Sequence, residues 1–262
     1  MPKTYPFKQR LLQLDSIINA LGWLWRPQPF KESRPAWCEQ LPELTEALLQ
    51  LTERELSLLS NSHPALINWL VHYLPELEPL IELCELPPHS TTELKAPDPH
   101  LTTAIPGRKL EQIELFAAAV GVIENPVVEW CGGKGHLGRR LALNWQQDIS
   151  TIEYNAKLCR AGETLAKKAK VKQRFYKVDV LSPDSTPFLP QRHAVALHAC
   201  GDLHRTLIRR AVEAKSPAID LVPCCYHLGH LEDDEDDAHD EQYNPFTEGL
   251  QLRLDRDALR LA

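Results

Sequence analysis

Apolar and polar positions follow two different patterns along the chain. Residues 41–86 carry leucines at helical spacing, interrupted by several prolines, and this pattern predicts a series of short helices. From residue 126 onward, short apolar runs alternate with amphipathic stretches. This alternation is typical of a parallel sheet with helices on both of its faces. The sequence therefore predicts a helical N-terminal domain over residues 1–96 and an α/β domain over residues 97–262.

The α/β pattern is regular enough to place individual elements. Strands are predicted at 126–130, 148–153, 173–180, 193–198 and 218–223, and helices at about 107–121, 155–169 and 203–214. Residues 87–106 are rich in Pro and Thr and predict a linker, although such a stretch can also lie across a pocket. After the fifth strand only GLQLRLDRDALRLA remains, which can supply one strand or the start of a helix. We therefore expect an incomplete sheet or a chain that stops before its natural end.

The composition is that of an ordinary soluble globular protein. Of the 262 residues, 43% are hydrophobic and 25% are charged, without an apolar run long enough to span a membrane or a secretory leader. The seven cysteines show no CxxC spacing. An odd number of cysteines without such pairs favours a reducing, cytoplasmic setting over a disulfide framework.

The net charge of −7 comes from one segment. Residues 232–241 hold eight of the 36 acids, so the rest of the chain balances 28 acids against 29 Lys and Arg residues, and nucleic acid is not excluded as a partner. We expect the acidic segment to be a flexible loop. Residues 167–177 hold six cations with Phe175 and Tyr176 among them, which predicts either a phosphate-contacting edge or a solvated helix end. Residues 1–36 are also basic. Two interpretations are open, a short helix at 11–21 and an arm that touches RNA or protein, and the sequence favours the helix.

The first predicted strand runs into a glycine turn, in the stretch VVEWCGGKGHLGRRLA at 127–142. A strand, a glycine turn and a helix start together form a site for anions and nucleotides, because glycines admit a ligand close to the backbone. GKGHLG matches the dinucleotide pattern GxGxxG, which alone is weak evidence. Glu129 at the strand end is similar to the acid that holds the methionine end of S-adenosylmethionine (SAM) in methyltransferases. SAM is therefore the first hypothesis for the ligand and NAD the second.

Two further acids are predicted at strand ends beside this turn. Glu153 ends the second strand, eighteen residues after Gly135, where an acid can accept both ribose hydroxyls of either cofactor. Asp179 ends the third strand, at a position that accepts from the adenine amino group in methyltransferases, and Val180 would lie against the ring. Three acids at successive strand ends favour a SAM pocket.

The fourth and fifth strands end in HACGD and PCCYH, the most unusual residues of the chain. We weigh three functional interpretations: a polar cradle with Asp202, His198 or His227 as a base, a zinc site of thiolates and imidazoles, and a reactive cysteine. The alternative is that the cysteines act as small buried hydrophobes. The spacing favours no metal site, because no separate second pair has ligand spacing.

Together, EWCGGKGHLGRRLA, HACGD and PCCYH resemble a family of Rossmann-like SAM-dependent methyltransferases over about 105–230. The family includes methyltransferase-like proteins with a GKGHLS-type turn and, more distantly, tRNA 2′-O-methyltransferases. The resemblance implies cofactor-binding roles for Glu129, Cys131, Gly133, Gly135, Glu153, Asp179, Val180 and His198. On the substrate side it implies roles for Cys200 and Gly201 and catalytic roles for His198, Asp202, Cys224, Cys225, Tyr226 and His227. The zinc-binding modules of the tRNA enzymes are missing before residue 100, so their substrate does not simply transfer.

The sequence thus predicts a Rossmann-like SAM methyltransferase sheet behind a helical N-terminal domain. The predicted activity is methyl transfer to RNA (tRNA or rRNA) or to a protein. One alternative is a non-catalytic methyltransferase-like module that recruits partners. A less favoured one is an NAD-dependent oxidoreductase, which would have no evident use for Glu129 or Asp179.

Overall fold

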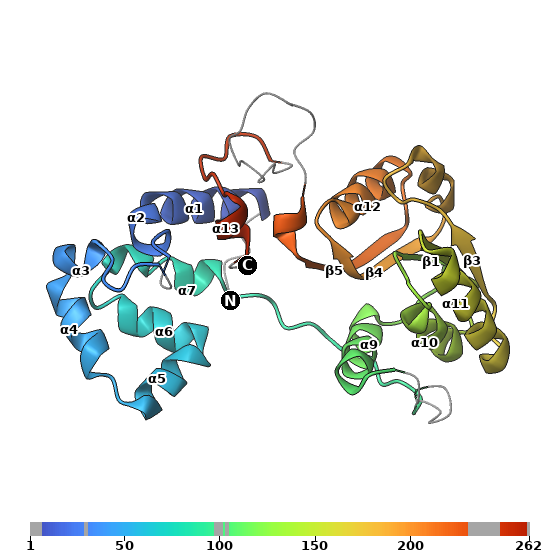
Figure 1. Ribbon diagram of the computed structural model, residues 1–262, viewed down its shortest axis with the longest axis horizontal. Helices are drawn as coiled ribbons and strands as arrows, with labels where there is room; N and C mark the ends of the chain where they lie inside the picture. Colours follow the sequence, from blue (N-terminus) through green and yellow to red (C-terminus); the bar gives the residue numbers. More distant parts are fainter. Residues whose placement is uncertain (1–6, 29–30, 97–101, 103–104, 230–246, 261–262) are drawn as a thin grey trace. The chain divides into compact units, whose positions relative to one another are not determined.

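The computed structural model describes residues 7–28, 31–96, 102, 105–229 and 247–260 (Figure 1). The acidic segment 232–241 lies outside the described residues. The chain divides into two compact units. One comprises residues 1–87 with 239–258, and the other comprises residues 88–238 with 259–262.

The first unit consists of short helices, as the leucine spacing and the prolines predict. They are α1 (Phe7–Ala20), α2 (Gly22–Trp25), α3 (Trp37–Gln40), α4 (Pro42–Gln50), α5 (Glu53–Ser60), α6 (His63–Leu70), η1 (Pro75–Leu77) and α7 (Leu80–Leu83). Proline begins α4 and η1, where its missing N–H costs no helical hydrogen bond. Leu21, Leu44, Leu74 and Leu77 form the buried core of this unit.

Residues 247–258 belong to this helical unit and not to the sheet. The buried carboxylate of Asp15 on α1 accepts the backbone N–H groups of Gln251 and Leu252, at 2.9 Å each. The helix start allowed by the sequence is present as α13 (Arg256–Leu259), and residues 247–255 form no strand. A buried carboxylate that accepts two backbone donors ties the two ends of the chain together.

The second unit is built on a parallel five-stranded sheet in the order β3-β2-β1-β4-β5. Its strands are β1 (Val127–Trp130), β2 (Ile149–Glu153), β3 (Gln173–Lys177), β4 (His193–Cys200) and β5 (Ala218–Cys224). The sequence pattern predicted all five, but β3 ends three residues early and β4 runs two residues further. The strand order reverses beside β1, so the crevice for a ligand is expected at the carboxyl end of β1.

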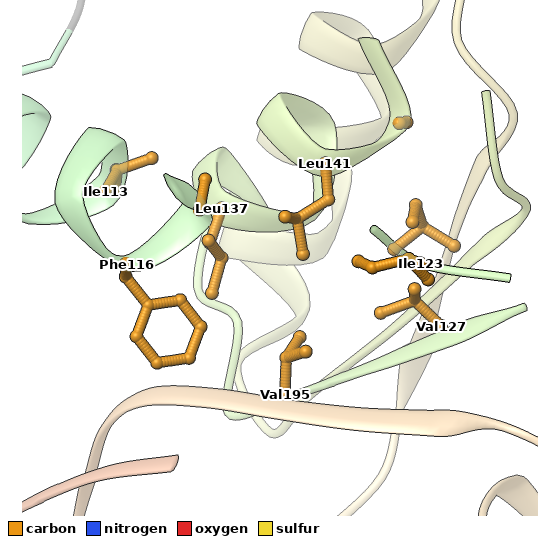
Figure 2. Close-up of a cluster of buried hydrophobic side chains, with 10 residues drawn as sticks. Ile113, Phe116, Ile123, Val127, Leu137, Leu141 and Val195 are labelled. Atoms are coloured by element: carbon orange, nitrogen blue, oxygen red, sulfur yellow. The ribbon is translucent and has the colours of Figure 1, made fainter. Parts of the chain in front are cut away.

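Helices cover both faces of this sheet (Figure 1). On one face, α9 (Gly107–Val120) and α10 (His136–Trp145) pack Ile113, Phe116, Leu137 and Leu141 against Val127 and Val195, as Figure 2 shows. α11 (Ala156–Ala169) covers β3 and β2. On the other face, Leu207 and Ala211 of α12 (Asp202–Glu213) pack in one buried cluster with Val128 and Trp130. The alternation of Val127 and Val128 between the two clusters follows from the two-residue period of a strand. The predicted Rossmann-like α/β fold is thereby confirmed.

The predicted linker is in part a packed segment of the second unit. Thr92 donates its backbone N–H to Ala118 O of α9 at 2.9 Å, and Lys95 donates its own to Asn144 Oδ1 of α10 at 3.0 Å. Arg140 donates to the Lys95 carbonyl at 2.7 Å. These hydrogen bonds hold the segment along the helices, together with Leu94 and Ile105, which pack against the buried apolar cluster. Among the described residues, no helix is long and apolar enough to cross a membrane.

Trp130 is the largest fully buried side chain, and its Nε1 donates to the carbonyl of Leu203 at 3.0 Å. We expect Trp130→Ala to lower the free energy of unfolding by about 3–5 kcal/mol, because it opens a cavity under α12 and removes this hydrogen bond. Urea denaturation followed by circular dichroism measures the loss. As a matched control, Trp23→Ala removes a 40% exposed side chain and is expected to cost much less. Similar losses in the two variants would contradict the assignment of Trp130 to the core.

Candidate functional site

The glycine turn between β1 and α10 places backbone close to open space. Cys131, Gly133 and Gly135 all have positive φ, at 54°, 59° and 65°. A Cβ on Gly133 would find no atom within 4 Å, so this residue borders a cavity. A Cβ on Gly135 would lie 2.3 Å from Gln173 Nε2, so this glycine is required for close packing of the turn on β3. Two cavities beside the turn are described in the next paragraphs. Every predicted cofactor residue except Gly135 lines at least one of them.

Glu129 is buried beneath this turn, with 3% of its surface exposed. Its Oε1 accepts Gly138 N at 2.9 Å, and its Oε2 accepts Thr151 Oγ1 at 2.7 Å and Gln173 Nε2 at 3.3 Å. Burial raises the pKa of Glu129, and the hydrogen bonds from Gly138 and Thr151 and the charges of Arg139 and Lys109 oppose that rise. A carboxylate offers about four lone-pair positions, so three donors leave about one for a ligand. Glu129 thus braces the turn and also faces the first cavity.

The first cavity lies between the turn and α9. Polar groups on its wall come from Lys109, Glu129, His136 and His198, and its volume is about 80 Å³. His136 is the first residue of α10, where helix N–H groups attract anions. The cavity thus combines a carboxylate with a lysine and a helix start, which suits the ammonium and carboxylate ends of an amino acid.

The second cavity lies on the other side of Cys131, which lines both. It has a volume of about 340 Å³, within the range of small-molecule sites. Its walls come from the ends of β1, β2 and β3 and from α12: Cys131, Glu153, Tyr154, Val178, Asp179, Val180 and Leu203. Burial, together with the charges of Glu153, Cys200 and Asp179, raises the pKa of Cys131 to about 12. The Cys131 thiol is therefore neutral at pH 7, which argues against a reactive nucleophile at this position.

The two acids of the second cavity already support its walls. Glu153 accepts Gly133 N at 2.9 Å and Asn155 N at 2.8 Å, and Asp179 accepts Leu181 N at 3.0 Å. Asp179 follows the end of β3 by two residues and lies in a loop, not on a strand as predicted. These contacts aim both carboxylates at one cavity and leave lone pairs for ligand hydroxyl or amino groups.

HACGD and PCCYH lie against one another at the ends of β4 and β5. Cys200 is the register partner of Cys224, and their Sγ atoms are 3.4 Å apart. A Cβ on Gly201 would come within 2.4 Å of the Leu228 backbone, so a glycine is needed for this approach. His204 packs edge-on against Tyr226 with 5.5 Å between ring centroids. The two motifs therefore form one structural unit.

The predicted catalytic residues occupy different parts of this region. His198 sits at a bulge of β4 with φ 72°, lines the first cavity, and bonds Gln112 Oε1 through Nε2 at 3.1 Å. Asp202 begins α12 and accepts Arg205 Nη1 at 2.9 Å. Cys224, Cys225, Tyr226 and His227 end β5 and form the turn after it, and none of them lines either cavity. Burial, with the charges of Lys109 and Arg108, lowers the pKa of His198, which favours the neutral base at pH 7.

Several residues of the site have no signal in the sequence. Gln173 donates to Glu129, Thr151 and the Gly135 carbonyl, yet it reads as an ordinary first residue of a strand. Thr151 is hidden in the same way within β2. Lys109 and His136 gave a weak signal, because a cation at a helix start and the residue after a glycine turn are often close to the ligand. Tyr154 directly follows Glu153, the acid predicted to bind the ribose, and this position is the clue in the sequence that Tyr154 lies near the ligand.

His136 provides a test of the electrostatics of the first cavity. Burial, with the charges of Arg139, Lys109 and Lys134, lowers its pKa from 6.5 to about 4. As the pH falls, the His136 imidazole binds a proton in the unfolded chain near pH 6.5, before it does so in the folded chain. The free energy of unfolding therefore keeps its full value above pH 6.5 and decreases as the pH drops toward 4. We expect His136 to account for about 2–3 kcal/mol of that fall. Urea titrations at pH 7, 5 and 4 should show a smaller acid loss in His136→Gln than in the wild type. Equal losses would contradict the shift.

Comparison with known proteins finds one family match, and it lies in the second unit. Residues 108–230 match a family model described as a methyltransferase domain. This part of the second unit is therefore similar to a methyltransferase domain. The domain contains both cavities and both motifs. A search of curated proteins found no match to the chain.

Several solved structures are similar at low identity. A tRNA (uracil-54, C5)-methyltransferase of Pyrococcus abyssi, in complex with S-adenosyl-L-homocysteine, is 16% identical with a TM-score of 0.36, over 44% of this chain and 28% of that one. A precorrin 8w decarboxylase of Methanobacterium thermoautotrophicum is 14% identical with a TM-score of 0.37, over 53% and 71%. A magnesium protoporphyrin IX methyltransferase of Synechocystis PCC 6803 is 13% identical with a TM-score of 0.34, over 47% and 54%. The chain thus spans less than a third of the length of the first of these proteins.

Proposed function

We propose that the chain is an enzyme that transfers the methyl group of SAM to RNA, with tRNA or rRNA as the acceptor. One observation carries the proposal: two cavities meet at Cys131, one with Glu129 on its wall and the other with Glu153 and Asp179. A methyltransferase domain accounts for this division, because SAM has an amino-acid end and a nucleoside end. An NAD-dependent oxidoreductase would leave Glu129 and Asp179 without a use.

The residues of the two cavities fit the two ends of SAM. We propose that Glu129 faces the ammonium group and that Lys109, with the start of α10 at His136, faces the carboxylate. Glu153 would accept the ribose hydroxyls, and Asp179 the adenine amino group. Val180 and Tyr154 supply apolar surface for the adenine ring. Gly133 allows the cofactor to pass close to the turn. Cys131 lies between the two cavities, and its side chain is small enough to leave room for a cofactor that occupies both.

SAM supplies an activated methyl group, so the protein has mainly to position the acceptor. His198 is the natural candidate for a neutral base, because its pKa is lowered and it lines the cavity of the amino-acid end. Asp202 is held by Arg205 at the start of α12, where it can orient an acceptor hydroxyl or amine. We propose that Cys224, Cys225, Tyr226 and His227 form the acceptor side of the site.

An RNA acceptor is supported by the charge at the sheet edge. The cations of 167–177 are all exposed: Lys167, Lys168, Lys170, Lys172, Arg174 and Lys177. Lys172, Arg174 and Arg192 line a separate cavity of about 400 Å³ at this edge. The aromatics among them do not add a stacking surface, because Phe175 packs against Gly162 and Tyr176 against Phe188. The edge therefore favours phosphate contacts over base stacking.

Calorimetric titration with SAM, S-adenosylhomocysteine and NAD tests the cofactor assignment. Binding of the first two without NAD is expected, and NAD binding alone would overturn the assignment of SAM as the cofactor.

Transfer of a labelled methyl group from SAM to RNA and protein fractions then tests the acceptor. Label in protein alone would refute the RNA proposal. SAM binding without any transfer would support a non-catalytic module instead.

The charged edge gives a prediction for RNA binding. We expect Lys168→Glu combined with Arg174→Glu to weaken binding of total tRNA and to reduce the salt slope of log K by about 1–2. Fluorescence anisotropy between 50 and 200 mM salt measures both quantities. Lys95→Glu combined with Lys215→Glu changes the net charge equally at exposed positions elsewhere in the domain and serves as the control. Equal weakening in both double variants would indicate a net-charge effect and refute the edge as the contact.

A further inference from the structure

Three cysteines gather where β4 and β5 end. The Sγ atoms of Cys200, Cys224 and Cys225 all lie within 4.8 Å of one another, and those of Cys200 and Cys224 are 3.4 Å apart. The three residues are half-buried. The cavity contacts described above do not use them, and buried hydrophobes would not need to direct three sulfurs toward a common point.

The spacing of the sulfurs suits a single tetrahedral ion. With a Zn–S distance of about 2.3 Å, two thiolates of a tetrahedral site lie about 3.8 Å apart. The 3.4 Å between Cys200 and Cys224 and the 4.8 Å limit on all three separations are compatible with this value, so an ion could be accommodated with small rotations of the side chains. Soft thiolate ligands select thiophilic ions such as Zn²⁺ over Mg²⁺ or Ca²⁺.

The backbone holds this arrangement in place. Cys200 and Cys224 are paired in the parallel register, which sends their side chains to the same side of the sheet. Cys225 has φ 51° and ψ 51°, the left-handed conformation that non-glycine residues rarely adopt. That turn brings the third thiol back beside the other two. Gly201 N donates to the Cys224 carbonyl at 3.3 Å and keeps the two strand ends together.

Sequence spacing could not reveal this cluster. Cys224 and Cys225 are adjacent, and Cys200 lies 24 residues earlier, so no ligand-type interval appears. The sheet register supplies the third ligand. The sequence spacing favoured no metal site, whereas the geometry of the three sulfurs gives a reason to test for one.

We propose that Cys200, Cys224 and Cys225 bind one thiophilic divalent cation, Zn²⁺, through three sulfurs, with no fourth ligand among the residues that the structure describes. An open fourth position is the mark of a site that can bind water or a substrate atom. The cluster lies at the ends of the strands that supply the proposed acceptor side. The proposal does not depend on methyl transfer, because metal binding is measured directly.

Cobalt substitution tests the site in the full chain. The protein is purified under reducing conditions, stripped with a chelator and titrated with Co²⁺, whose thiolate charge-transfer absorption reports the number of bound sulfurs. We expect one Co²⁺ per chain with an intensity typical of three thiolates, and displacement by Zn²⁺. Cys200→Ser and Cys225→Ser should each remove about a third of the charge-transfer intensity and weaken the affinity at least tenfold.

The control is Cys84→Ser, which replaces an exposed cysteine of the helical unit and should leave the spectrum unchanged. Circular dichroism confirms that each variant is folded, and two independent cysteine variants guard against one that is not. Absence of charge-transfer absorption in the reduced wild type would overturn the proposal. Intensity unchanged in both cluster variants would do the same. If mass spectrometry of the reduced protein shows a persistent Cys200–Cys224 disulfide, the cluster is a cross-link and not a metal site.

Discussion

Replacing Glu129 by alanine is expected to abolish SAM binding and to lower the free energy of unfolding by about 3–5 kcal/mol. The carboxylate accepts Gly138 N, Thr151 Oγ1 and Gln173 Nε2 inside the domain. Alanine leaves these buried donors without their acceptor, and each unsatisfied donor costs about 1–3 kcal/mol. Because Gly138 belongs to the first turns of α10, the glycine turn should loosen together with the helix start that faces the ligand.

Two further variants separate stability from binding. Glu129→Gln keeps the shape of the side chain and one acceptor oxygen, which can still accept the backbone N–H of Gly138. We expect this variant to remain folded and to bind SAM at least tenfold more weakly, because the charge that faces the ammonium group is lost. Gly133→Val leaves Glu129 intact and places a branched side chain at φ 59°, in the space proposed for the cofactor.

Calorimetry measures SAM affinity in all three variants, and urea denaturation measures stability. Wild-type affinity in both Glu129→Ala and Gly133→Val would refute the pocket. Loss of stability without loss of affinity in Glu129→Ala would show that the carboxylate braces the turn but does not bind the ligand.

The parts of the site that the sequence predicts are those set by short-range patterns. The strand ends are visible because an apolar run stops at a polar residue, which locates Glu129 and Glu153. The turn is visible because positive φ requires glycine at Gly133 and Gly135. Cys131 shows the limit of this rule, since it adopts φ 54° without being a glycine.

The parts that remained hidden depend on contacts between distant residues. Gln173 supports Glu129 from β3, 44 residues further along the chain, and no local pattern distinguishes it from a surface glutamine. Asp179 lies past the end of β3, although its apolar neighbours extend the strand pattern to residue 180. Gln251 and Leu252 follow the sheet in sequence but donate their backbone N–H groups to Asp15 of α1, because a buried carboxylate can satisfy such groups as well as a strand does. The register that places Cys200 beside Cys224 was hidden for the same reason, because it joins residues that are far apart in the sequence.

We expect Asp202→Asn to reduce methyl transfer by about 10²–10⁴-fold while the affinity for SAM stays within twofold of the wild type. Asp202 lines neither of the two cavities assigned to the cofactor, so binding should not depend on it. It begins α12 beside the HACGD and PCCYH unit, and Arg205 holds its carboxylate in place. Asparagine keeps the size of the side chain and removes the charge that would orient or deprotonate the acceptor.

Single-turnover transfer from labelled SAM to the RNA fraction, with calorimetry on the same preparations, measures both quantities. Asp184→Asn, which changes an exposed acid at the start of η2 (Pro183–Phe188), is the matched control and should leave both unchanged. Because Asp202 is also paired with Arg205, a purely structural role would lower stability and SAM affinity together. Loss of transfer alone therefore assigns Asp202 to the acceptor side. Undiminished transfer would move the catalytic role to His198, whose neutral imidazole already faces the cavity of the amino-acid end.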